Sequence, residues 1–253
     1  MSAILAKIVA AAGFAGVAVA LAVRMRLGLA REIALASLRA GVQLAAVGAA
    51  IALVFRYPAL AFVFVGVMVL TAGLTAGGRL RGLPGARRRA LVAIAVPALV
   101  ATGALLLVGA FALSARAGVP TAGILIGGAL AATTLTGRRL LESLVDEAGE
   151  IEARLCLGDD ARGALAPAVR RAVTTGLIPV IDQTRSVGLV TLPGTFVGLV
   201  LGGASAAQAA ATQLVVLLAL VAVELGAGLL LAELTQRALI EPGERVALPH
   251  VDR

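Results

Sequence analysis

The feature that most constrains this chain is a series of long apolar runs separated by more polar segments. Each run has about 17 to 23 mostly apolar residues, which as a helix matches a hydrocarbon core of about 30 Å. The runs cover residues 4–23, 33–55, 58–76, 91–113, 119–137, 186–203 and 213–234. Because 60% of the chain is hydrophobic and only 14% is charged, a soluble core could not hide this surface. The sequence therefore predicts an all-α, polytopic bundle of seven transmembrane helices, with 1–253 as a single transmembrane domain.

The arginines alternate between the two ends of these runs. The segments after the first, third and fifth runs are rich in arginine, whereas the second and fourth hold only Arg56 and Arg116 and the sixth holds none. Positive segments stay on the cytoplasmic side, so we expect the N-terminus outside and the C-terminus inside a cell membrane, inner or plasma. The formal net charge of +8 is then explained by arginines at the cytoplasmic ends of the spans, and no nucleic-acid partner is predicted.

Residues 138–185 form a large polar segment that we expect to be a helical cytoplasmic loop between the fifth and sixth spans. An apolar stripe at helical spacing and the i, i+4 pair Glu150 and Arg154 predict an amphipathic helix. Gly158 is suited to close it, and Asp159 or Asp160 to cap the next helix. A helix lying on the inner leaflet is the alternative. The stripe comprises Leu144, Ala148, Ile151 and Leu155.

This loop resembles the EAA loop of ABC transporter permeases, in which Glu-Ala-Ala, three residues and Gly precede a second helix. Glu152, Ala153 and Gly158 match, and Arg154 replaces the second alanine. The resemblance implies a coupling helix that binds a separate P-loop ATP-hydrolysing subunit. The residues it assigns to ATPase coupling are Glu152, Ala153, Leu157, Gly158, Asp159 and Asp160.

The stretch "IPVIDQTRSVGLVTLPGTFVGLVLGG" resembles the signature of the FetB-like (YbbM-type) permease family, and "SLRAGVQLAAVG" resembles another of its segments. This family includes a bacterial iron exporter subunit and plant aluminium-tolerance proteins. The resemblance implies an ABC permease domain that exports a metal ion such as iron, and analogy with other ABC systems implies a homodimer. ATP and Mg²⁺ would bind the partner subunit, and no cofactor would bind directly to this chain. Relatives carry methionines where this chain has 195–197, so the metal ligands are unknown.

Several polar residues and helix breakers fall inside the predicted spans. Pro193 removes a backbone donor and frees the carbonyl of Leu189, which is tolerated in a membrane inside protein or beside a cavity. A broken helix along a translocation path and an ordinary proline kink both explain this stretch. Asp182 and Arg185 are expected near the inner rim, where their position favours a structural tie and a role along the path is the alternative. The candidate path residues are Arg39, Gln43, Asp182, Leu189, Pro193, Gly194 and Glu224.

Glycines at four-residue spacing indicate close helix packing, within one chain or at a subunit seam. They are Gly123 and Gly127, and Gly194, Gly198 and Gly202.

The sequence contains no ATPase or other enzyme motif. A P-loop requires lysine after a glycine-rich turn, and the sole lysine is Lys7 in the first run. A permease driven by a separate ATP-binding subunit is the leading hypothesis. The alternative is a stand-alone ion or small-solute carrier driven by a gradient, in which Arg39 and Glu224 pair or share a cavity.

Overall fold

The computed structural model describes residues 2–248, which divide at Pro58 into two compact units. The first unit is a helical hairpin of α1 (Ser2–Arg24) and α2 (Ala30–Arg56). Its turn contains Gly28 at a φ of 72°, a left-handed conformation in which glycine has no steric cost. Among the described residues of this hairpin only Ala22 and Val54 are buried, so most of its apolar surface needs lipid or protein around it.

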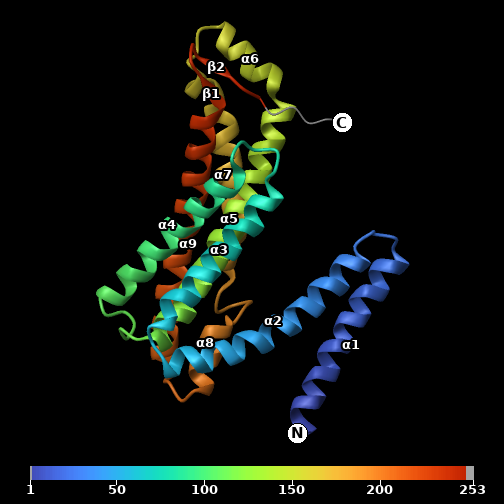
Figure 1. Ribbon diagram of the computed structural model, residues 1–253, viewed down its shortest axis with the longest axis vertical. Helices are drawn as coiled ribbons and strands as arrows, with labels where there is room; N and C mark the ends of the chain where they lie inside the picture. Colours follow the sequence, from blue (N-terminus) through green and yellow to red (C-terminus); the bar gives the residue numbers. More distant parts are fainter. Residues whose placement is uncertain (1, 249–253) are drawn as a thin grey trace. The chain divides into compact units, whose positions relative to one another are not determined.

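The second unit contains the remaining helices and one small hairpin (Figure 1). The helices are α3 (Leu60–Arg79), α4 (Ala86–Leu107), α5 (Ala115–Asp146), α6 (Ala148–Cys156), α7 (Ala161–Ser186), α8 (Gly194–Leu201) and α9 (Ala206–Leu239). Strands β1 (Ile240–Glu241) and β2 (Arg245–Val246) pair antiparallel directly after α9. In Figure 1, α6 and the hairpin lie at one end of this unit, and α8 lies toward the other.

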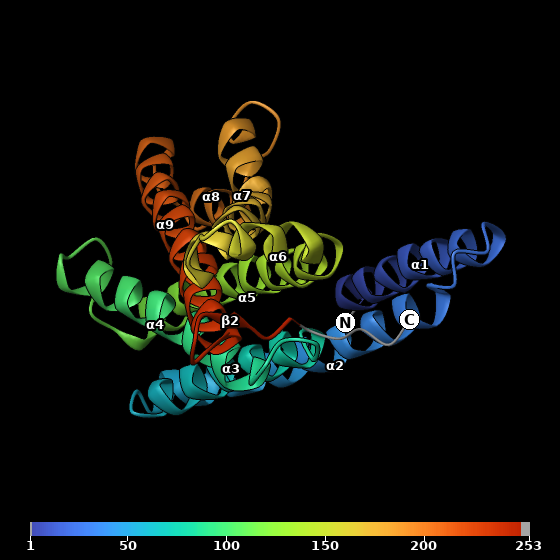
Figure 2. The same cartoon turned by 90° about the horizontal axis from the view of Figure 1, so that it is seen from above.

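The centre of the second unit is built by α5 and α9, its two longest helices. They have 32 and 34 residues, so they extend about 48 and 51 Å, well beyond a hydrocarbon core of about 30 Å. Helix α5 packs against α3, α4, α7 and α9, and Figure 2 shows it between α3 and the α7–α9 pair. The core is rich in alanine, such as Ala76, Ala129 and Ala227, which lets these helices approach closely.

Glycines mark the closest approaches between helices. A Cβ atom at Gly73 would lie 2.8 Å from the Leu91 Cα atom, and one at Gly77 would overlap the backbone of Arg87, so α3 and α4 touch through their backbones. Of the predicted packing glycines, only Gly123 faces another helix so closely, with the Met68 side chain 2.8 Å from its Cβ position.

The other predicted packing glycines make no such contact with the described residues. Nothing lies within 4 Å of the Cβ positions of Gly127, Gly194 and Gly198, and that of Gly202 meets only carbonyls of α8. The packing role assigned to these four is therefore not seen within the chain, and a subunit seam stays a prediction for them.

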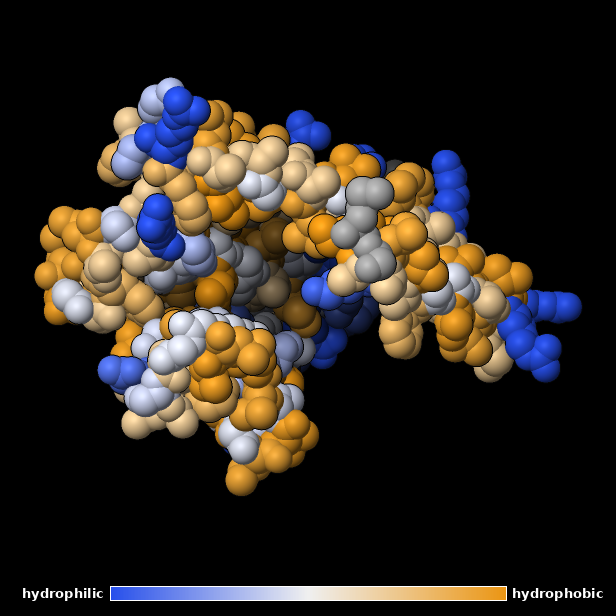
Figure 3. Space-filling model, turned by 90° about the horizontal axis from the view of Figure 1, so that it is seen from below, coloured by the Kyte–Doolittle hydropathy of each residue, from blue (hydrophilic) through white to orange (hydrophobic). Residues whose placement is uncertain are grey.

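The outer surface of the helices is strongly apolar. Large side chains such as Phe62 and Leu107 are more than four-fifths exposed, and Figure 3 shows an extensive hydrophobic surface with scattered hydrophilic residues. Within residues 2–248, seven helices are long and apolar enough to cross a membrane. The prediction of an all-α, seven-span membrane protein is thus confirmed.

Six of the expected spans coincide with α1–α5 and α9, but the expected sixth span at 186–203 was wrong. The candidate span is α7, directly before it, and the chain then leaves the helix at Ser186. Gly188 adopts a φ of 82° in a turn closed by its amide and the Thr191 carbonyl, 2.8 Å apart. The helix that follows, α8, has only eight residues, or about 12 Å, too few to span.

This shift changes the boundaries of the predicted coupling loop. Of residues 138–185, the first part continues α5 and residues 161–185 belong to the candidate span α7. Only residues 147–160, with α6 at their centre, remain between two candidate spans. Pro167, expected in the first turn of a separate helix, lies inside α7 instead.

Candidate functional site

The predicted coupling residues gather at one sharp corner between α6 and α7. Gly158 follows α6 with a φ of 100°, its amide bonds to the Leu155 carbonyl, and the Asp159 amide bonds to the Arg154 carbonyl. These two bonds are a Schellman motif, which favours glycine at this position. Asp160 then caps α7 by accepting a hydrogen bond of 2.7 Å from the Gly163 amide. The capping roles predicted for Gly158 and Asp160 are confirmed, although the capped helix is the long α7.

The corner has an anchored inner face and an exposed outer face. Ile151 is buried in a cluster with Leu144 and Leu165, so the apolar stripe predicted for this region does pack against the bundle. On the other face Glu152 and Ala153 are exposed, and Leu157 is 87% exposed. An isolated helix of nine residues is unstable in water, so α6 depends on this anchoring.

Ion pairs reinforce the corner. Arg154 lies 3.1 Å from Glu150, as predicted, and 3.7 Å from Asp159 beyond the turn. Arg171 of α7 pairs with Glu147, which joins α7 to the segment between α5 and α6. Each pair is partly exposed and individually weak, so the pairs fix the orientation of the corner more than they stabilise it.

The C-terminal segment holds the first turn of α7 in place. Glu244 accepts a 2.8 Å hydrogen bond from the Ala161 amide, and the Gln236 side chain donates one of 3.0 Å to the Arg162 carbonyl. Glu233 pairs with Arg162 at 2.7 Å. Sequence reasoning missed these residues because they lie more than 70 positions from their partners, and no local pattern links them.

The core of the second unit contains an acidic side chain. Glu224 of α9 is 6% exposed and makes no hydrogen bond or ion pair with any described residue of this unit. Its carboxylate lies against α5, where a Cβ atom at Gly128 would be 2.7 Å from Oε1. A buried, unpaired carboxylate is costly, so Glu224 remains a candidate functional residue.

Further unpaired polar groups lie near the same helices. The hydroxyl oxygens of Thr133, Thr136 and Thr235 are buried without a hydrogen-bond partner among the described residues. Thr136 lies where α5, α7 and α9 meet, because a Cβ atom at Gly176 would overlap its hydroxyl and one at Gly228 would lie 3.1 Å from it.

The other predicted path residues are not brought together with Glu224. Asp182 lies 3.8 Å from Arg185, as expected, and at the opposite end of α7 from α6; its placement near the inner rim stays a prediction. Leu189 is 92% exposed in a turn, so Pro193 frees no helical carbonyl there; Pro193 instead precedes Gly194, the first residue of α8. The helix is thus broken, and a role along a path stays a prediction.

Arg39 and Gln43 are exposed residues of α2, in the other unit. Their proposed place in a path, and the pairing of Arg39 with Glu224, stay predictions.

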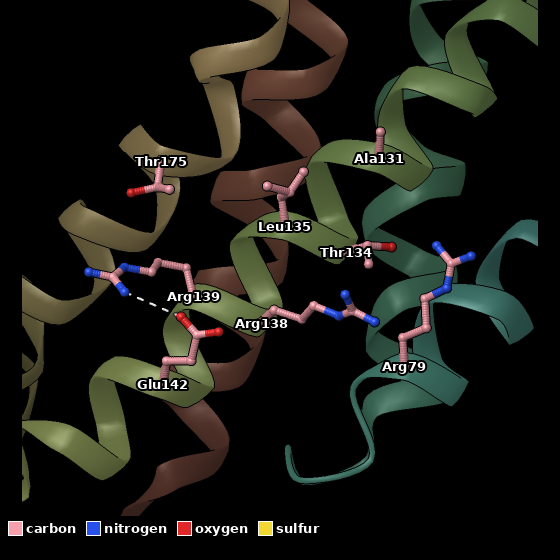
Figure 4. Close-up of a pocket in the computed structure, with 8 residues that line it drawn as sticks. All are labelled: Arg79, Ala131, Thr134, Leu135, Arg138, Arg139, Glu142 and Thr175. Atoms are coloured by element: carbon pink, nitrogen blue, oxygen red, sulfur yellow. Dashed lines mark hydrogen bonds and ion pairs between the residues drawn. The ribbon is translucent and has the colours of Figure 1, made fainter. Parts of the chain in front are cut away.

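A cavity of about 470 Å³, with several charged side chains in its lining, opens over the face of α5 between α3 and α7 (Figure 4). Its polar lining consists of Arg79, Thr134, Arg138, Arg139, Glu142 and Thr175. Arg139 and Glu142 form an ion pair of 3.2 Å, and the Thr134 hydroxyl donates to the Leu130 carbonyl. Among residues 2–248, no group of three or more His, Cys, Asp or Glu side chains is placed to hold a metal ion.

An α-helical multi-pass bundle with an anchored, exposed helical corner between two candidate spans defines a class of polytopic membrane proteins. Similarity to known protein families then places the chain in one family of that class. The family model described as "Uncharacterised protein family (UPF0014)" matches residues 5–240, and the chain belongs to this family.

Relatives extend over most of the chain. The UPF0014 membrane protein STAR2 of rice (Oryza sativa subsp. japonica) is 37% identical over 213 residues, which cover 83% of this chain and 75% of the relative. The Arabidopsis thaliana protein ALUMINUM SENSITIVE 3 is 33% identical, covering 79% and 74%. The probable iron export permease protein FetB of Escherichia coli is 29% identical, covering 79% and 78%. No solved structure matches the chain.

Proposed function

We propose that this chain is the membrane-spanning permease subunit of an ABC-type transporter, driven by a separate ATP-binding subunit. The observation that carries the proposal is the α6 corner, which is anchored from beneath by Ile151 and presents the 87% exposed Leu157 on its outer face. The cap at Gly158 and the ion pairs of Arg154 fix this corner, while Glu152, Ala153 and Leu157 stay uncovered, so a partner subunit would meet a surface of defined shape between two candidate spans. The permease name of the Escherichia coli relative supports the same assignment.

The geometry gives the corner a route to the membrane helices. Helix α6 joins the ends of α5 and α7, which pack along each other and meet at Thr136 and Gly176. A force applied to α6 therefore acts on both helices at once. Close packing without room for adjustment transmits such a displacement, because packed helices shift as units.

The cargo and assembly belong to the same proposal. Export of a metal ion such as iron is supported by the name of the Escherichia coli relative, and a homodimer by analogy with other ABC systems. ATP and Mg²⁺ would bind the partner subunit, since the chain offers no P-loop lysine outside its first helix. A gradient-driven carrier without an ATPase is the second candidate, which the buried and unpaired Glu224 favours.

Co-expression of the full chain with a candidate P-loop ATPase separates the two. We expect the proteins to purify together, and we expect Leu157→Glu to abolish this association while the permease remains folded. Leu113→Glu is the matched control, because Leu113 is 79% exposed in the loop between α4 and α5. Equal retention of the ATPase by both variants would contradict docking at the corner, and iron transport that is indifferent to the ATPase would favour the carrier.

A further inference from the structure

The cavity between α3, α5 and α7 carries more positive charge than its own carboxylate can balance. It is lined by three arginines and one glutamate, and the glutamate is engaged by Arg139. Arg79 and Arg138 form no ion pair with any described residue. In Figure 4, Arg138 extends from α5 toward Arg79 at the end of α3. Two guanidinium groups that face each other repel, and an anion between them removes that repulsion.

The chemistry of the lining matches a phosphate group. Guanidinium forks bind phosphate oxygens with paired N–H donors, and Arg79 and Arg138 supply two forks that no described carboxylate engages. Ala131 and Leu135 supply an apolar wall beside these donors. An apolar wall lowers the local dielectric constant and strengthens the attraction for an anion.

The depth of the cavity is set by α3. This helix has 20 residues and ends at Arg79, so its length of about 30 Å equals the thickness of the hydrocarbon core. If α3 crosses the membrane, Arg79 lies at the edge of the hydrocarbon core, next to the headgroup region. Arg81, Arg87 and Arg88 line a second cavity beside the end of α3, so this end of the unit is basic beyond the cavity itself. Basic pockets between helices at this level attract anionic headgroups.

We propose that this cavity is a binding site for a phosphate group, held between Arg79 and Arg138 at the membrane boundary. Its depth makes an anionic phospholipid headgroup the expected source. Binding at this site requires no step of the proposed transport. It gives the bundle a lipid-dependent contact that joins α3 to α5.

The test uses the full chain in nanodiscs that contain phosphatidylglycerol in excess phosphatidylcholine. Native mass spectrometry measures how much phosphatidylglycerol remains bound after release. We expect the double variant Arg79→Gln, Arg138→Gln to retain at least about tenfold less than the parent, since two charge-assisted contacts are lost. The matched control is Arg170→Gln, an exposed arginine of α7 outside the cavity, which should change retention less than about twofold.

The second arm of the experiment tests soluble phosphate. It measures how far inorganic phosphate shifts the unfolding temperature of lipid-depleted protein in neutral detergent. If the double variant loses the phosphate response but keeps phosphatidylglycerol, the site stands and its source is a soluble phosphate. If the double variant matches Arg170→Gln in both arms, the proposal is overturned. Arg138→Lys keeps the positive charge but loses the guanidinium fork, and it is the variant to use if the double variant does not fold. Unchanged retention of phosphatidylglycerol by folded Arg138→Lys would refute a bidentate contact with phosphate.

Discussion

The contact between Gly176 and Thr136 allows a sharp test of how tightly α7 packs on α5. Gly176→Ala adds a methyl group whose carbon would overlap the Thr136 hydroxyl and lie 3.2 Å from the Thr136 backbone nitrogen. Backbone cannot rotate away, so α7 must move outward. Overpacking of this kind costs about 1–3 kcal/mol, whereas replacing glycine by alanine in a helix gains about 1 kcal/mol.

Gly103→Ala in α4 is the matched control, because nothing lies within 4 Å of the Cβ position of Gly103. In Gly103→Ala the free energy of unfolding should rise only by the difference in helix propensity between glycine and alanine. The difference in free energy of unfolding between the two variants is then the overpacking term, about 1–3 kcal/mol. At about 2–4 °C per kcal/mol for a chain of this size, thermal unfolding in detergent resolves it.

Removing the obstacle should restore part of the stability. Thr136→Ala alone should cost little, because its buried hydroxyl has no hydrogen-bond partner among the described residues. In the Gly176→Ala background the same change removes the hydroxyl overlap but leaves the backbone nitrogen, so rescue should be partial. A double-mutant cycle without coupling, or Gly176→Ala as stable as Gly103→Ala, would refute the close approach of α5 and α7.

Three further predictions address single residues. Glu224→Gln should keep or raise stability in detergent, because a buried unpaired carboxylate is removed. The same variant should lower iron flux in proteoliposomes at least about tenfold. Normal flux with a poor yield of folded protein would instead indicate a structural role for Glu224. Glu244→Ala should speed hydrogen exchange at the first turn of α7 about fivefold to thirtyfold, as expected for a lost cap of about 1–2 kcal/mol, whereas Glu241→Ala should not; equal exchange in both variants would contradict the cap. Asp182→Asn should change the free energy of unfolding by less than about 0.5 kcal/mol, because its pair with Arg185 is long and exposed; chemical unfolding that shows a loss above about 1 kcal/mol would show that Asp182 has another partner.

The spans with the strongest apolar signal could be predicted from the sequence, and the weakest one could not. Helix α7 has a mean hydropathy of 1.2 over its most apolar stretch, the lowest of the seven candidate spans, and it carries Arg162, Arg170 and Arg171 in its first half. The run 186–203 is more apolar but contains Gly188 and Pro193, which end regular helix there. Apolar length alone therefore selected the wrong one of two adjacent segments.

The caps at the corner between α6 and α7 could be predicted from the sequence, whereas the long-range contacts that hold this corner could not. Gly158 and Asp160 act on residues within a few positions, so their capping roles follow from residue type. The neighbours of Gly176 and the partner of Glu244 are set by tertiary packing, which no local pattern encodes. For the same reason the GxxxG spacing at 194–202 indicated packing that the chain by itself does not make.

The hydrogen bond from the Ala161 amide to Glu244 also orders events during synthesis. Ala161 emerges from the ribosome 83 residues before Glu244, so the start of α7 lacks this contact until residue 244 has been made. The beginning of α7 is therefore stabilised late during synthesis, after α9 has been made, by a contact that joins residues 83 positions apart.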